Sequence, residues 1–145
     1  MKAVHIVVGV LAIALNGGAA LLGAWSWWRV RTSGWFWRLL RAGQVVLVVE
    51  AALGGVLVLI GRKTSTLHLV YGLVPLAVSF VGEQLRVASA EAVLYARGHE
   101  AASSVGALPE PEQRAIVTAI VQRELGVMAL AAIVIVVLLS RAAGT

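Results

Sequence analysis

Four stretches of this chain are long and apolar enough to cross a lipid bilayer as helices. Such a helix needs roughly 20 predominantly apolar residues. Residues 3–28 contain no aspartate, glutamate, lysine or arginine, and residues 42–61 contain only Glu50. Residues 67–82 and 125–140 are likewise uncharged. A chain of this kind is expected to place each stretch in lipid as a helix, because a helix satisfies its own backbone polar groups there.

The composition agrees with a lipid-exposed surface. Apolar residues make up 60% of the 145 residues and charged residues 13%, whereas a soluble domain has about a quarter of its residues charged. We therefore predict an all-α integral membrane protein with one domain, folded as an up-and-down bundle of four transmembrane helices. The predicted helices span residues 3–27, 39–61, 67–96 and 111–141. The first apolar stretch exceeds the 7–15 residues of a signal peptide core and ends in an aromatic and basic segment, so we expect a retained helix.

The basic residues flank the apolar stretches, where they act as topology signals. The first loop carries four arginines, and the third loop with its flanks carries four more, against four basic residues on the opposite side. This bias predicts the cytoplasmic membrane as the location, with the first and third loops in the cytoplasm and both termini outside. The net charge of +5 then indicates contact with anionic lipid head groups rather than with nucleic acid.

The first and third helices carry the same pattern on one face. His5 is followed by Gly9 and Asn16, and His68 by Gly72 and Ser79 at the same offsets, which lie on one side of a helical wheel. If both helices run in the same direction, these faces are expected to meet with like residues at like depths. The pattern predicts a duplication of two helical hairpins. The second helix presents a face of small residues around one acid, formed by Gly43, Glu50, Gly54 and Gly61.

The two histidines are candidate axial ligands for a b-type haem. Neutral imidazole binds haem iron, and His5 and His68 are expected at the same, outer, end of neighbouring helices. A porphyrin is wide and flat, so the residue one turn from each ligand must be small, and Gly9 and Gly72 meet this need. The arrangement resembles di-histidine membrane cytochromes in general.

Other residues complete the predicted haem site. The propionates would point towards Arg62 and Lys63 in the outer turn, and Tyr71 could donate a hydrogen bond at the pocket wall. The alternatives are a site for another metal, which lacks an evident third ligand, and histidines that simply lie at the membrane interface. The chain has no cysteine, which excludes thiolate ligands and covalent haem attachment.

Glu50 is the other residue that is costly to place in lipid. It lies at the centre of the second predicted helix, and we expect it to form a polar layer near the bilayer midplane with Asn16 and Ser79. Gln44 could join this layer from one turn nearer the cytoplasm. The layer is either a carrier site for a proton or cation, or a polar contact that fixes the helix register.

These features leave three functions open. The first is a haem-b protein that passes electrons between an outer-face partner and a membrane quinone, or that senses or handles haem. The second is a proton-coupled transporter or channel that uses Glu50, with two copies of the chain forming the pathway. The third is a non-enzymatic accessory subunit of a larger membrane complex, docked through its tryptophans and its polar third loop. No common enzyme motif occurs in the sequence, and whether the chain has an enzymatic activity stays open.

Overall fold

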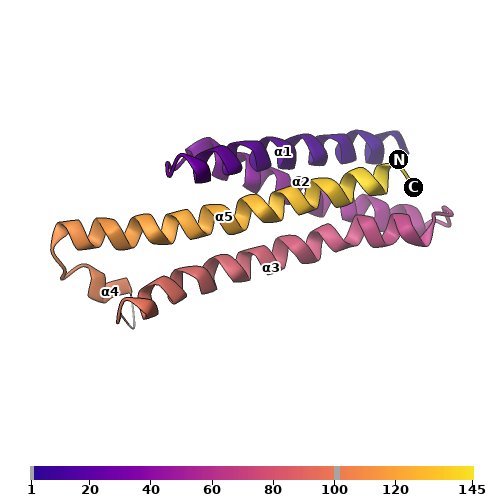
Figure 1. Ribbon diagram of the computed structural model, residues 1–145. Helices are drawn as coiled ribbons and strands as arrows, with labels where there is room; N and C mark the ends of the chain where they lie inside the picture. Colours follow the sequence, from indigo (N-terminus) through magenta and orange to yellow (C-terminus); the bar gives the residue numbers. More distant parts are fainter. Residues whose placement is uncertain (1, 100–101) are drawn as a thin grey trace.

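A computed structural model describes residues 2–99 and 102–145, which fold as helices joined by short turns (Figure 1). Four long helices are apolar and long enough to cross a membrane. The elements in chain order are α1 (Lys2–Trp28), α2 (Gly34–Leu59), α3 (Thr66–Ala96), the short α4 (Ala102–Val105) and α5 (Glu110–Ala143). The predicted all-helical class is thereby confirmed. The membrane orientation stays a prediction.

The long helices alternate in direction, so the two termini lie at the same end of the molecule (Figure 1). Helix α5 packs along both α1 and α3. Helix α2 packs along α1. Within the described residues α1 and α3 do not pack along their lengths, and α2 touches α3 over only a short region. The like faces of α1 and α3 therefore meet only at the end that carries His5 and His68, whose rings are 6.0 Å apart, because α5 lies between the two helices over most of their length.

The α1–α2 contact is a series of large side chains opposite glycines. A Cβ atom on Gly23 would lie 2.6 Å from the Phe36 ring, and one on Gly43 would lie 2.8 Å from Asn16 Nδ2. Further along, a Cβ atom on Gly9 would lie 2.8 Å from Glu50 Oε1. Small residues allow membrane helices to approach closely, and here they also fix the antiparallel register of the pair.

The core lies where α1, α2 and α5 converge. One cluster gathers Phe36 and Leu40 with Leu125 and Met128, and Ala19 fills the space between them. A second cluster continues towards the termini and contains Ala12, Leu47, Ile135 and Leu139. The buried residues of α1 are all small or short, namely Ala12, Asn16, Ala19, Ala20, Gly23 and Ser26. The face predicted from the helical wheel is thus the face that α1 buries, although its partners are α2 and α5.

Helix α2 begins at Gly34, five residues before the expected start at position 39. The Ser33 hydroxyl caps this helix by accepting a hydrogen bond from the Phe36 amide at 3.4 Å. Phe36 is then carried into the core, where it is fully buried. Trp35, Phe36 and Trp37, which fall between the first two predicted helices, therefore belong to the first turn of α2. This difference also moves Glu50 away from the middle of the helix.

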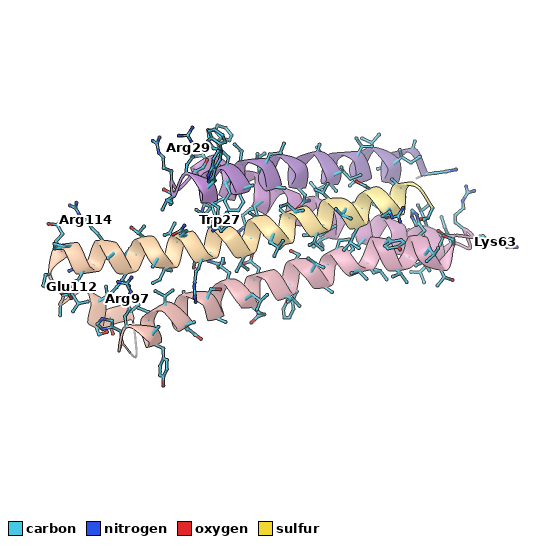
Figure 2. All side chains as sticks on the ribbon, in the orientation of Figure 1. Trp27, Arg29, Lys63, Arg97, Glu112 and Arg114 are labelled. Carbon is cyan, nitrogen blue, oxygen red and sulfur yellow. The ribbon has the colours of Figure 1, made fainter. Side chains whose placement is uncertain are left out.

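Helices α3 and α5 extend beyond α1 and α2 at the end far from the termini (Figure 1). The 34 residues of α5 correspond to about 50 Å of helix, whereas the hydrocarbon core of a bilayer is about 30 Å thick. A small cluster of Leu94, Val105 and Ile116 holds α4 between the extended ends. The charged residues Arg97, Glu112 and Arg114 gather at this end and Lys63 at the opposite end (Figure 2).

Candidate functional site

A pocket of about 700 Å³ lies among the helices at the end that carries the termini. All four long helices contribute to its walls, and most of the lining side chains are aliphatic or glycine. His5 and Gly9 come from α1, Glu50 from α2, and His68 and Gly72 from α3. The volume is within the range of about 300–1,000 Å³ that is usual for ligand and cofactor sites.

His5 and His68 approach each other across this pocket. Their ring centroids are 6.0 Å apart and the ring planes are inclined by 64°. Two imidazoles that bind one metal ion on opposite sides, at about 2 Å from each nitrogen, have ring centroids about 6 Å apart. Helices α1 and α3 do not pack along their lengths, and the two histidines meet near the ends of these helices.

Each histidine has one ring nitrogen close to an oxygen of another helix. His68 Nδ1 is 2.9 Å from the carbonyl oxygen of Ala142 in α5, and His5 Nδ1 is 3.0 Å from Glu50 Oε1. The second pair is within hydrogen-bond distance, but it does not meet the angular requirement for a hydrogen bond. A carbonyl and a carboxylate both favour a proton on Nδ1, which leaves Nε2 with the lone pair that binds a metal.

Glu50 lies level with Gly9 and His5, not with Asn16 and Ser79 as expected. Because α2 spans Gly34–Leu59, Glu50 lies past the centre of the helix, on the side of the end at Leu59. The side chain is 13% exposed, and within the described residues its Oε2 atom has no hydrogen-bond partner. Gly9 makes room for the carboxylate, since a side chain there would displace it. Asn16 packs against Gly43 and Ser79 is hydrogen-bonded to the adjacent Gln44, so of the three predicted residues only Glu50 lies away from this level.

A second hollow of about 610 Å³ adjoins the first at the end that carries the termini. His5 and His68 line both hollows, and the cationic side chains of Lys2, Arg62 and Lys63 line this outer one. Arg62 and Lys63 thus lie where haem propionates were expected. Tyr71 is half-buried and is not among the described residues that line either hollow.

The other expected polar residues lie deeper in the bundle, away from the histidines. Gln44 donates hydrogen bonds to Ser79 Oγ at 3.2 Å and to Glu83 Oε1 at 2.9 Å. Glu83 also forms ion pairs with Arg41 and, at 3.1 Å, with Arg86. These contacts tie α2 to α3 at the inner end of the pocket, so Gln44 and Ser79 have a structural role in holding the two helices together.

Asn16 is fully buried and donates a hydrogen bond from Nδ2 to the carbonyl oxygen of Ala12 at 2.8 Å. It packs against Gly43 of α2, and within the described residues it forms no hydrogen bond or ion pair with Ser79 or Glu50. Its side chain therefore fills the space opposite Gly43 and is hydrogen-bonded within its own helix.

Two contributors to the site were not predicted. The carbonyl of Ala142 belongs to the backbone, so no side chain in the sequence could have indicated it. Lys2 lies beside the histidines because α1 begins at that residue. Gly54, by contrast, was placed on the correct face of its helix, and its lack of a side chain leaves room for His5, whose Cε1 would lie 3.4 Å from an added Cβ.

Residues 2–99 and 102–145 contain no group of three or more histidine, cysteine, aspartate or glutamate side chains that could hold a metal ion. This argues against a zinc or copper centre built from protein ligands alone. A haem iron needs only two ligands from the protein, because the porphyrin supplies four. Comparison of the chain with family models, curated protein sequences and solved structures found no match.

Proposed function

We propose that this chain is a haem-b protein of the cytoplasmic membrane, with His5 and His68 as the axial ligands of the iron. The observation that carries the proposal is the 6.0 Å separation of the two imidazole rings across an apolar pocket. Bis-histidine ligation leaves no open position on the iron, which favours electron transfer over the binding of a small ligand. One electron at a time would pass to or from a partner at the outer face or a membrane quinone.

The surroundings of the histidines support this assignment. Gly72 leaves open space in the pocket, since an added Cβ there would have no neighbour within 4 Å, as a flat macrocycle requires. The space at Gly9 is taken by the Glu50 carboxylate, and the space at Gly54 by the His5 ring. Carboxylates of the propionates would meet Arg62 and Lys63 in the outer hollow. Apart from the two histidines and Glu50, the residues that line the pocket are apolar or glycine, which suits the porphyrin ring.

The proposal extends to the membrane arrangement. We propose that both termini and the α2–α3 turn face outwards, and that the extended ends of α3 and α5 with the α1–α2 loop face the cytoplasm. The two hairpins α1–α2 and α3–α5 place one histidine each at the same end of the molecule. This placement supports an origin by duplication of a single hairpin.

Measuring the haem content of histidine variants tests the assignment. Full-length protein is purified in mild detergent after expression with added haem precursor, and bound haem is measured per polypeptide. We expect His5→Ala and His68→Ala to lose most of the haem, and His99→Ala to keep it, because His99 lies at the opposite end of α3. Equal haem contents in all three variants, or none in the unmodified protein, would rule out the proposed ligands.

A further inference from the structure

The turn between α1 and α2 carries two arginines that have no acidic partner among the described residues. Arg41, Arg86 and Arg114 each form an ion pair with a glutamate, whereas Arg29 and Arg31 form none within residues 2–99 and 102–145. The first 49 residues of the chain contain no aspartate or glutamate. Helix α5 places no acid beside the turn either, where it contributes Val117, Thr118, Val121, Gln122 and Leu125. The described part of the chain therefore leaves the positive charge of this turn without an ion pair.

The backbone of the turn is strained between these two arginines. Val30 has a φ of 50°, a conformation that is a genuine outlier for a β-branched residue. Two hydrogen bonds close the end of α1 around it, from the Val30 amide to the Trp27 carbonyl at 3.2 Å and from the Arg31 amide to the Ser26 carbonyl at 3.0 Å. Such strain persists where surrounding contacts fix it, and it is frequent at binding sites. The closed turn places Arg29 and Arg31 on the same hollow.

This hollow has a volume of about 570 Å³ and combines apolar with hydrogen-bonding surface. Leu22 and Trp25 of α1 provide the apolar part. Two guanidinium groups and three hydroxyl groups provide the donors, and they belong to Arg29, Arg31, Ser26, Thr32 and Ser33. No carboxylate lines the hollow within the described residues. The combination fits a ligand that has both an anionic group and a hydrocarbon part.

Two tryptophan rings hold the guanidinium group of Arg29. Its Cζ atom lies 4.7 Å from the centroid of Trp25 and 5.9 Å from that of Trp28. The two rings are nearly perpendicular, at 83°. A cation–π contact uses the flat face of the guanidinium group and leaves its N–H edges free to donate hydrogen bonds. Arg29 lies at the end of α1 opposite the termini (Figure 2), and exposed tryptophans of this kind are typical of the head-group level.

We propose that this hollow binds the head group of one anionic phospholipid from the cytoplasmic leaflet. Arg29 and Arg31 bind the phosphate oxygens, for which the planar guanidinium group is well suited, and Leu22 and Trp25 contact the start of the acyl chains. A zwitterionic lipid would bring its cationic group next to the arginines, where no described carboxylate can receive it. The site therefore selects anionic over zwitterionic lipid. It lies at the end of the bundle opposite the histidines, so it does not depend on the proposed haem site.

Native mass spectrometry of the full-length protein, released from micelles that contain equal concentrations of phosphatidylglycerol and phosphatidylcholine, tests the inference. We expect one phosphatidylglycerol to stay bound to each polypeptide. The double variant Arg29→Gln/Arg31→Gln should bind it about 25-fold more weakly, at about fivefold for each arginine. The control is Arg97→Gln/Arg123→Gln, which removes the same charge from exposed arginines that do not line the hollow. The control should bind phosphatidylglycerol as the unmodified protein does.

Three outcomes would overturn the site. Equal binding of the two lipids would show that the hollow does not select charge, and equal losses in the two double variants would show a general attraction to basic protein. Displacement of the lipid by millimolar inorganic phosphate would show a site for the free ion. Circular dichroism shows whether each variant has folded. If the double variant does not fold, Arg31→Gln is compared with Arg123→Gln, and equal affinities of these two would refute the proposal. The haem content of the histidine variants tests the proposed function alone.

Discussion

Replacing Gly23 by alanine should destabilise the bundle, because three helices meet at this position. A Cβ atom there would lie 2.6 Å and 3.0 Å from two carbons of the Phe36 ring and 2.8 Å from Ala129 Cβ. Carbon atoms in contact are normally about 3.5–4.0 Å apart. Phe36 is fully buried and the Ala129 Cβ is fixed to its backbone, so neither can move aside alone. Helix α1 must shift away from α2 and α5 by about 1 Å.

This shift gives a magnitude for the effect. Inserting a methyl group into a packed core costs about 1–3 kcal/mol, and the clash on two sides places Gly23→Ala in the upper half of that range. Alanine regains up to about 1 kcal/mol of helix propensity, which leaves a net loss of about 1–2 kcal/mol. Unfolding in mixed micelles with a rising SDS fraction, followed by circular dichroism, measures the difference. Gly17→Ala is the matched control in the same helix, since a Cβ there has no neighbour within 4 Å. Equal stability of the two variants would refute the packing argument.

Three further predictions concern the site, the α2–α3 contact and the membrane orientation. Gly72→Leu should lower bound haem several-fold without loss of stability, because a side chain at Gly72 enters the open pocket. Haem absorbance per polypeptide and SDS unfolding test this prediction, and an unchanged haem content would contradict it. Arg41→Met should cost no more than about 1 kcal/mol in the same unfolding assay, because this ion pair is partly exposed; a much larger loss would show a buried role for the pair. In this cysteine-free chain, Thr64→Cys should react with an impermeant maleimide in intact cells and Ser103→Cys only after permeabilisation, and the reverse pattern would invert the proposed topology.

The sequence predicted which side of a single helix is buried. The periodicity of α1 indicated the face that contains Asn16, and this face is buried together with Ala12 and Gly23. The periodicity could not identify which helix covers that face, because α2, α3 and α5 all present small residues. The position of α5 between α1 and α3 therefore became apparent only from the structure.

The start of α2 determined how well the site could be predicted. The tryptophans around Phe36 are typical of a membrane interface, and the predicted second helix accordingly begins after them, at residue 39. The cap at Ser33 and the burial of Phe36 instead extend the helix backwards. That extension sets the α1–α2 register and moves Glu50 from the expected midplane layer to His5. The contact between Glu50 and His5 could therefore be predicted from the sequence only if the start of α2 were placed correctly.

The most direct test of the account is the visible absorption spectrum of the full-length protein in mild detergent, recorded oxidised and then reduced with dithionite. Six-coordinate haem b between His5 and His68 predicts a sharp Soret band that shifts on reduction, together with well-resolved α and β bands. A protein that stays colourless after haem is offered would contradict the central claim, and Glu50 would then have to be explained without a haem beside it.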